Sequence, residues 1–253
     1  MYSPENTGSS GYLMVHDHRL GPEYLTGIER LFPVIDMCPF RAPQEGYDPV
    51  YGSISSHPDI YLTRLDERTV ICSPGIPGGV RSKLLSFGMA IIEGECVPRG
   101  KYPFTAAYNA ARVGKTLFAN TRSADKVLMR EAVVRGLRIV HVEQGYSACS
   151  VVAVGDDGLI TSDAGIAAAA RGAGLDVLEV SCGNISLAGQ RYGFLGGASG
   201  EVPGEGILFT GDLAFHPDGE AIKDFIRCSG MDAVSLTGLE LVDCGKLFFF
   251  EKP

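Results

Sequence analysis

The stretch Tyr192-Gly-Phe-Leu-Gly-Gly-Ala-Ser-Gly200 opens a predicted hairpin that turns near Pro203 and returns to Thr210. Four other segments of the chain have the same plan, in which a short apolar strand turns and runs back as a second strand. The five turns lie near residues 67, 113, 156, 203 and 244, so they recur about every 45 residues. A constant period of this length indicates internal repeats, each of which is one supersecondary unit.

In four of the five units the hairpin leads into a predicted helix and a further strand. The last hairpin, predicted over residues 239–250, has no helix after it, whereas residues 11–37 read as strand, helix and strand with no hairpin before them. We therefore expect residues 11–37 to complete the fifth unit and close a ring, which also removes exposed sheet edges. The sequence predicts one α/β domain over 11–253, built from five pseudo-symmetric ββαβ-type repeats, with a loose terminus over 1–10.

Composition narrows the classes of function. The net charge of −8 argues against binding to nucleic acid, which requires a basic surface. No apolar run approaches the roughly 20 residues that span a bilayer, and the N-terminus lacks the features of a signal peptide. Seven cysteines without paired spacing indicate reduced thiols and a cytoplasmic protein rather than a disulfide framework.

Three segments resemble a known superfamily. They are Ile54-Ser-Ser-His-Pro-Asp59, Gln144-Gly-Tyr-Ser-Ala-Cys-Ser150 and Tyr192 to Gly200. Together with the repeat, they make the chain similar to the penteins, the guanidino-group-modifying enzymes, and more narrowly to an uncharacterised bacterial family of that fold. The resemblance covers roughly residues 11–250 and implies a five-bladed α/β propeller. The superfamily includes deiminases, a dimethylaminohydrolase, amidinotransferases and a non-catalytic ribosome anti-association factor.

The resemblance also implies catalytic residues. Pentein enzymes carry a cysteine nucleophile in the last repeat, where this chain has Cys244, and a histidine in a His-x-Asp step, which matches His57-Pro-Asp59. This chain departs from the pattern in two respects. Its His-x-Asp step lies in the first repeat rather than the fourth, and it has no clear Glu-Gly-Gly-Asp segment.

The chemistry of the residues leads to the same positions. Attack on a guanidinium carbon needs a thiolate, a group that exchanges protons, and carboxylates that orient the planar cation. His57 titrates near neutrality in its reference state and suits the proton exchange. Asp59, Asp243 and Glu240 supply carboxylates. The opposing interpretation places His57 in a surface loop and Cys244 as a small residue in a tight turn.

Other residues remain open alternatives. Cys149 is a rival nucleophile at the start of the third hairpin, although buried cysteines are more often structural. Asn109 and Ser199 occupy similar points of the second and fourth hairpins, where they line a central pocket or satisfy backbone groups. His16 and His18 share a strand face, but no third ligand accompanies them, so we expect no metal and no cofactor.

The sequence thus predicts a cysteine-dependent hydrolase or amidinotransferase-like enzyme acting on a small guanidino, amidino or related cationic substrate. The alternative is a non-catalytic binding or scaffold protein on the same fold. The expected partner is a small cationic molecule, not nucleic acid or a membrane, and the oligomeric state does not follow from the sequence.

Overall fold

Five three-stranded sheets, each with one helix, make up most of the computed structural model, which describes residues 11–42 and 48–253. The segment 1–10, predicted to be a loose terminus, lies outside the described residues. In each sheet two strands pair antiparallel and a third joins in parallel, and the helix connects the two parallel strands. The ββαβ-type unit predicted from the sequence period is therefore present five times in the described residues.

The strands of the five sheets, in sheet order, are β3 (Leu62–Arg64), β4 (Thr69–Cys72), β5 (Ala90–Glu93); β6 (Ala111–Val113), β7 (Thr116–Ala119), β8 (Arg138–His141); β9 (Val151–Val154), β10 (Gly158–Thr161), β11 (Asp176–Glu179); β13 (Ser199–Val202), β14 (Gly206–Phe209), β15 (Ala233–Ser235); and β17 (Phe248–Glu251), β1 (Tyr12–Asp17), β2 (Asp36–Phe40). The connecting helices are α2 (Gly78–Ser86), α3 (Lys126–Val134), α5 (Ala164–Ala173), α6 (Gly219–Cys228) and α1 (Pro22–Leu31).

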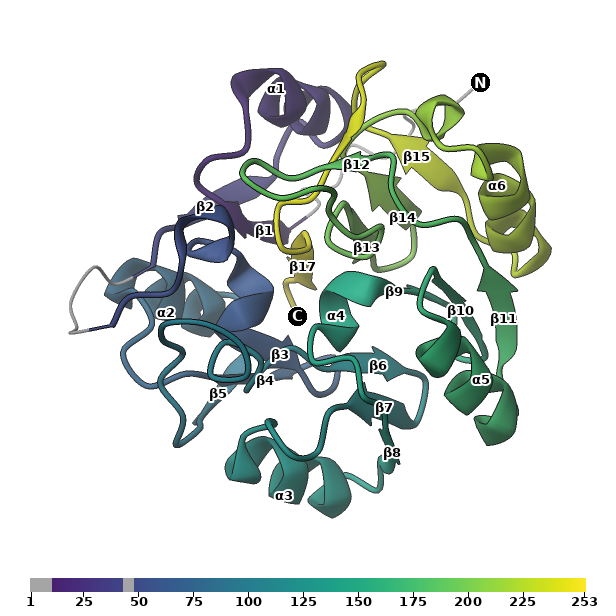
Figure 1. Ribbon diagram of the computed structural model, residues 1–253. Helices are drawn as coiled ribbons and strands as arrows, with labels where there is room; N and C mark the ends of the chain where they lie inside the picture. Colours follow the sequence, from purple (N-terminus) through teal and green to yellow (C-terminus); the bar gives the residue numbers. More distant parts are fainter. Residues whose placement is uncertain (1–10, 43–47) are drawn as a thin grey trace.

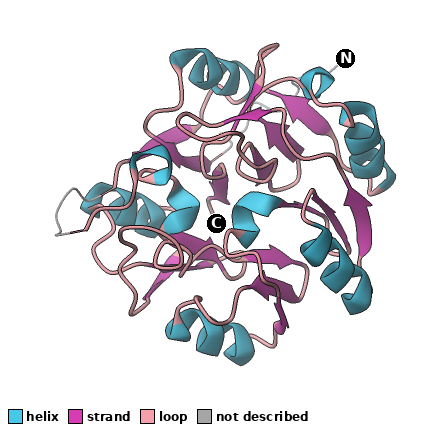
Figure 2. Ribbon diagram, in the orientation of Figure 1, coloured by secondary structure: helices cyan, strands magenta, loops and turns pink. Residues whose placement is uncertain are grey.

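The connecting helices lie on the perimeter of the molecule. Figure 1 shows α1, α2, α3, α5 and α6 around the outside, with β3, β6, β9, β13 and β17 toward the centre. Figure 2 shows the same separation of outer helices from inner strands. The second strand of each sheet is almost fully buried, because it packs between the perimeter helix and its neighbouring strands.

The fifth sheet joins the two ends of the chain. Strand β1 pairs antiparallel with β17, in a register that sets Leu13 opposite Phe250, and it pairs in parallel with β2. The N-terminal segment therefore shares a sheet with the C-terminal strand, and the aromatic run 248–250 is buried in this sheet.

The predicted hairpin over 239–250 is wrong. Its first part, β16 (Leu241–Val242), pairs in parallel with β12 (Ile185–Ser186), and its second part is β17. Between them the backbone is held by the fourth sheet, because the N–H groups of Cys244 and Lys246 both donate to the Gly197 carbonyl. The strand that returns beside β17 is β1, from the other end of the chain.

The inner strands are shorter than the sequence predicted. The hairpins expected to begin at Cys149 and Tyr192 have their first strands at Val151 and Ser199, and the strand before the turn near residue 113 begins at Ala111. The residues before the inner strands form turns at the centre of the molecule. The one-turn helix α4 (Ser147–Ser150) precedes β9, and the 3₁₀ turns η1 (Gly52–Ile54) and η2 (Pro58–Ile60) precede β3. A third 3₁₀ turn, η3 (Leu213–Phe215), precedes α6.

Two glycines of the opening stretch allow these central turns to approach closely. A Cβ atom at Gly196 would lie 2.4 Å from the Val151 carbonyl oxygen, and one at Gly197 would lie 2.0 Å from Oδ1 of Asp243. Real Cβ atoms do not approach this closely, so only glycine fits at either position.

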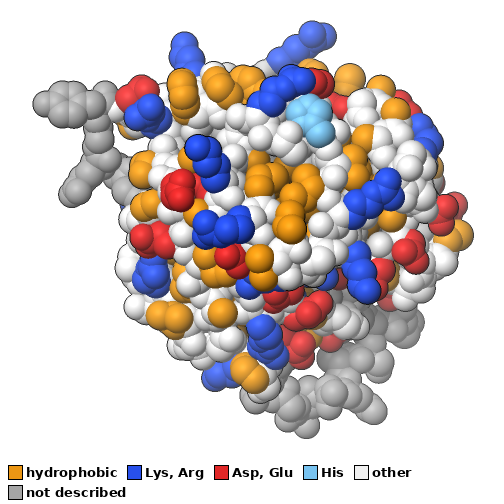
Figure 3. Space-filling model, turned by 90° about the horizontal axis from the view of Figure 1, so that it is seen from below, with side chains coloured by type: hydrophobic (Ala, Val, Ile, Leu, Met, Phe, Trp, Pro, Cys, Tyr) orange, Lys and Arg blue, Asp and Glu red, His pale blue; other side chains and the backbone are white. Residues whose placement is uncertain are grey.

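The surface carries charges of both signs. On the face shown in Figure 3, basic and acidic side chains alternate around a patch of apolar side chains. Over the described residues, no helix is both long and apolar enough to cross a membrane.

Candidate functional site

Three side chains from three different repeats meet at the centre of the molecule. Asp59 lies in the turn before β3, Asn109 lies just before β6, and Cys149 lies in α4 before β9. The Cys149 thiol donates to Oδ2 of Asp59 over 2.7 Å. Asn109 donates through Nδ2 to the Asp59 carbonyl oxygen at 3.2 Å and to Sγ of Cys149 at 3.3 Å. We call Asp59, Asn109 and Cys149 the polar layer.

Asn109 also orders the turn that carries Cys149. Its Oδ1 accepts hydrogen bonds from the backbone N–H groups of Ala148, at 2.7 Å, and Cys149, at 3.3 Å. One amide side chain therefore uses both its donor and its acceptor to hold two neighbouring repeats together. This satisfies buried backbone groups that would otherwise be costly to leave unpaired.

Burial controls the protonation of the polar layer. Asp59 is fully buried, and burial raises its pKa to about 6 against the lowering effect of the Cys149 hydrogen bond. Its Oδ1 has no hydrogen-bond partner among the described residues. Burial, reinforced by the charge of Asp59, raises the pKa of Cys149 well above its ordinary value. The thiol therefore remains protonated and acts as the donor in this pair.

A second group surrounds His57, one turn before Asp59. Its Nε2 lies 3.8 Å from Oδ2 of Asp17, and its Nδ1 lies 3.8 Å from Oδ1 of Asp243. The His57 side chain is buried against Gly245, where a Cβ atom would lie 2.1 Å from that of His57. Burial lowers the pKa of His57, although both carboxylates oppose this, so the ring is neutral at neutral pH.

The two carboxylates beside His57 have different surroundings. Arg19 forms an ion pair with Asp17, with 2.6 Å between Nη2 and Oδ2. Asp243 has no such counter-ion among the described residues and accepts backbone hydrogen bonds from Phe194 at 2.9 Å and Gly245 at 3.0 Å. Burial raises the pKa of Asp243. Arg19 compensates Asp17 and His57 is neutral, so the ionised form of Asp243 has no cationic partner among the described residues, and a cation bound beside Asp243 would favour that form.

These side chains line a small cavity with Cys244. The cavity has a volume of about 130 Å³, and its lining includes Asp17, Arg19, His57, Asp243 and Cys244. Sγ of Cys244 lies 3.6 Å from the Gly197 carbonyl oxygen. Burial, followed by the charge of Asp243, raises the pKa of this thiol well above its ordinary value. Residues that carry a thiol, an imidazole and two carboxylates thus line one small pocket.

The structure divides the predicted site residues into three groups. His57, Asp243 and Cys244 share the small cavity, and Asp59, Asn109 and Cys149 form the polar layer. The backbone N–H of Asp59 donates to the Gly245 carbonyl, which links the two groups. The third group lies apart from the small cavity. The Glu240 side chain is exposed at the surface, and Ser199 lines a different cavity, where its hydroxyl donates to the Gly196 carbonyl.

Asp17 and Arg19 were not predicted as site residues. Asp17 is the last residue of β1 and Arg19 follows that strand, in the segment where the sequence suggested only the histidine pair. His16, expected to be exposed, is buried, and its ring bonds the carbonyl oxygen of Asp17. In the described ranges no group of three His, Cys, Asp or Glu side chains is arranged to hold a metal ion. The signal that could have revealed Asp17 is its position at the carboxyl end of an apolar strand.

The sequence comparison identifies a family. Residues 43–248 match DUF6873, which is described as a family of unknown function. The chain belongs to this family. The comparison with curated proteins finds no match.

Solved structures show what fold the family has. The chain is similar to agmatine deiminase from C. jejuni, with a TM-score of 0.56 and 8% identity over 99% of this chain and 95% of the deiminase. It is also similar to dimethylarginine dimethylaminohydrolase, with a TM-score of 0.50 and 10% identity over 91% of this chain and 93% of that protein. Both are pentein-fold proteins, so this member of DUF6873 has the mixed α/β pentein fold.

Proposed function

We propose that the protein is a cysteine-dependent hydrolase or amidinotransferase-like enzyme that acts on a small guanidino or amidino cation. The observation that carries the proposal is the small cavity, whose lining includes Cys244, His57 and the two carboxylates Asp17 and Asp243. The ionised form of Asp243 favours a cation there, and a planar amidine can donate hydrogen bonds to a carboxylate. The pentein neighbours, one named for agmatine and one for dimethylarginine, support this class of substrate.

The residues supply the steps that such a reaction needs. Neutral His57 accepts the proton of the Cys244 thiol, and the thiolate attacks the central carbon of the cation to form a C–S bond. The C–N bond to the leaving amine then breaks, and the amine takes the proton from His57. A water molecule, or an acceptor amine in a transferase, gives a proton to His57 and displaces Sγ.

Substrate binding activates the nucleophile in this scheme. The Cys244 thiol is held protonated because burial and neighbouring carboxylates disfavour the thiolate. A bound guanidinium places a positive charge beside the sulfur and favours the thiolate. We therefore expect that Cys244 reacts faster with cationic reagents than with neutral ones.

Chloroacetamidine tests the assignment, because it is a cation that alkylates a thiol with loss of chloride. We expect mass spectrometry to find the adduct on Cys244, with labelling much faster than by neutral chloroacetamide. Cys244→Ala should lose this adduct and any release of amine from agmatine or dimethylarginine. Cys182→Ala, at an exposed thiol, is the matched control and should retain both.

Two results would contradict this assignment. Preferential labelling of Cys149 would transfer the nucleophile to the polar layer. Equal rates with the cationic and the neutral reagent would remove the evidence for a cation site around Asp243.

A non-catalytic binding protein is the second candidate. It is favoured by the Cys244 thiol, whose hydrogen bond runs to the Gly197 carbonyl rather than to His57. In that case guanidinium should bind to the protein, with binding weakened by Asp243→Asn, while amine release and alkylation of Cys244 remain absent.

The same proposal includes the architecture. The five sheets are the blades of a five-bladed propeller, closed where β17 meets β1, in one domain over residues 11–253. The repeated antiparallel-then-parallel order of all five sheets supports this arrangement, as do the perimeter helices in Figure 1.

A further inference from the structure

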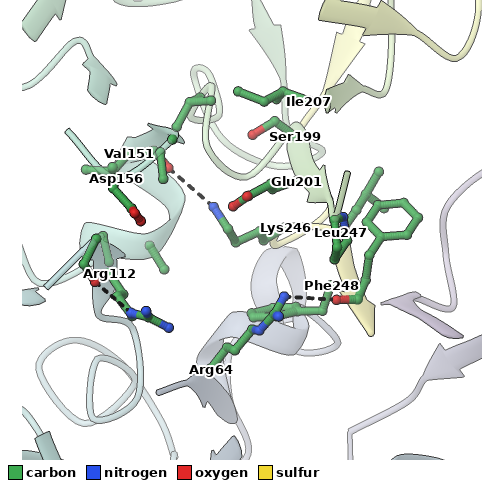
Figure 4. A pocket seen from close by; sticks show the side chains of 18 of the residues that line it. Arg64, Arg112, Val151, Asp156, Ser199, Glu201, Ile207, Lys246, Leu247 and Phe248 are labelled. Carbon is green, nitrogen blue, oxygen red and sulfur yellow. Dashed lines mark hydrogen bonds between the residues drawn. The ribbon is translucent and has the colours of Figure 1, made fainter. Parts of the chain in front are cut away.

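A second and larger cavity lies at the other end of the inner strands. Its volume is about 470 Å³, and its lining includes the hairpin-turn residues Gly114, Asp156 and Gly204. His57 and Cys244 precede the strands β3 and β17, whereas this cavity begins where those strands run toward their turns. The two cavities share no lining residue. We call this larger space the hairpin-end cavity, and Figure 4 shows it from close by.

Two cations reach into the hairpin-end cavity without a carboxylate partner. Arg64 donates to the carbonyl oxygens of Asp66, through Nε at 3.1 Å, and Phe249, through Nη1 at 3.2 Å. Lys246 donates to the Val151 carbonyl oxygen at 3.3 Å. Within the described residues neither forms an ion pair, and Nη2 of Arg64 makes no hydrogen bond.

Both cations are partly removed from water. Burial lowers the pKa of Arg64 and of Lys246, which means that their charged forms are poorly solvated. A partly buried charge without a counter-ion is costly, and a bound anion would reduce that cost. In Figure 4 the end groups of Arg64 and Lys246 point into the same space.

The other charges of the cavity limit the charge of the anion. Arg112 lies 3.6 Å from the carboxylate of Glu67, so this pair is compensated. Glu201 and Asp156 are exposed residues of the lining. Glu201 attracts both Arg64 and Lys246 and so offsets part of their charge, but it does so from an exposed position where water screens it. The charge that is left suits one negative charge better than the two of a phosphate.

The walls determine the rest of the ligand. Apolar side chains of Val151, Ile207 and Phe249 line the cavity between the charged groups. Apolar walls with a few placed polar groups are typical of sites for small organic molecules. We propose that the hairpin-end cavity binds a small monocarboxylate with an apolar body, whose carboxylate is held by Arg64 and Lys246.

Hexanoate is a suitable probe, and isothermal titration calorimetry with the full chain measures its binding. We expect saturable binding of hexanoate, and much weaker binding of hexan-1-ol and of hexylamine. Arg64→Gln and Lys246→Gln should each weaken hexanoate binding about tenfold or more, because each removes a charge-assisted hydrogen bond. Arg138→Gln, at an exposed arginine outside the cavity, is the matched control and should leave the affinity unchanged.

A third variant tests the location without changing a charge. Ala153 lines the cavity and is partly exposed to it, so Ala153→Leu should fill space and weaken hexanoate binding even if Arg64→Gln does not fold. Cys244→Ala should bind hexanoate as the parent does, which separates this site from the proposed catalytic one. The proposal is overturned if hexanoate does not bind, if hexan-1-ol binds equally well, or if inorganic phosphate binds more tightly.

Discussion

At the scale of single residues, Asp59 links burial to protonation. Its folded-state pKa of about 6 lies above the reference value of 3.8 because burial disfavours the carboxylate. Protonation of Asp59 therefore favours the folded state at low pH, and this contribution to stability is lost as the pH rises through about 6. The polar layer is expected to be most stable in acid, opposite to a salt-bridged aspartate.

Asp59→Asn tests this effect, because asparagine has no proton to lose in this range. From about pH 4 to about pH 7, the free energy of unfolding of the variant should rise relative to the parent by roughly 2 to 3 kcal/mol. Urea denaturation at several pH values measures the difference. Cys149→Ser retains the burial of Asp59 and should keep most of the parent's pH dependence. A pH-independent difference between Asp59→Asn and the parent would contradict this account.

The sequence identified the members of the polar layer but not their contacts. Asp59 was chosen as a carboxylate of the His-x-Asp step, Cys149 as a rival nucleophile and Asn109 for its place in its hairpin, and the structure brings the three within hydrogen-bonding distance. Forty or fifty residues separate them in the chain, so no local pattern encodes their partners. Lys246 is a second feature that the sequence does not reveal. Its backbone is left-handed, with φ of +70°, although a residue other than glycine rarely adopts this conformation.

At the scale of elements, one aspartate fixes helix α3 to the preceding loop. Oδ1 of Asp125 accepts from the N–H groups of Val127 and Leu128, and Oδ2 accepts from those of Glu95 and Cys96. Ser123, two residues earlier, is of a residue type that also favours the N-cap position, but the helix begins after Asp125. Asp125 does more than cap, since it also binds a loop about thirty residues away.

Asp125→Ala should therefore cost more than the loss of an ordinary cap. We expect the free energy of unfolding to fall by about 2 to 4 kcal/mol, since the partly buried N–H groups of the loop also lose their acceptor. Asp163→Ala is the matched control at α5, where the side chain accepts from one backbone group, Ile166. It should cost about 1 kcal/mol in the same denaturation experiment. Equal losses would show that the loop contact contributes nothing.

The fifth sheet shows which pairing a sequence pattern leaves undetermined. Strand-forming residues over 241–242 and 248–251 were recognised as strands, but an apolar strand pattern does not state which strand lies beside it. The backbone of residues 197–199 accepts hydrogen bonds from residues 244–247. These bonds hold the segment between β16 and β17, so the two strands do not pair with each other. The repeat period predicted the five units, but it did not predict that β17 pairs with β1.

At the scale of the whole molecule, the two ends of the described chain are adjacent. Tyr12 lies opposite Glu251, and the N–H of Lys252 donates to the Gly11 carbonyl at 2.7 Å. A short turn that joins Lys252 to Gly11 should therefore convert β17 and β1 into an ordinary hairpin. New ends can be placed between Ser229 and Gly230, which are exposed after α6.

We expect this circular permutant to fold with one cooperative unfolding transition and the parent's near-ultraviolet circular dichroism. A permutant with the same joint but with its ends inside the buried strand β4, between Val70 and Ile71, should not fold. If the first permutant also fails to fold, β17 and β1 cannot be joined by a short turn, and the prediction is wrong.

The pairing of β1 with β17 also determines when the fifth sheet can form during translation. The ribosome releases β1 first and β17 last, so the earliest strand waits through almost the entire synthesis for the neighbour on its open side. Until then its backbone groups on that edge are available to other nascent chains. The sheet that begins first is completed last, and premature termination anywhere upstream of β17 leaves it without its antiparallel strand.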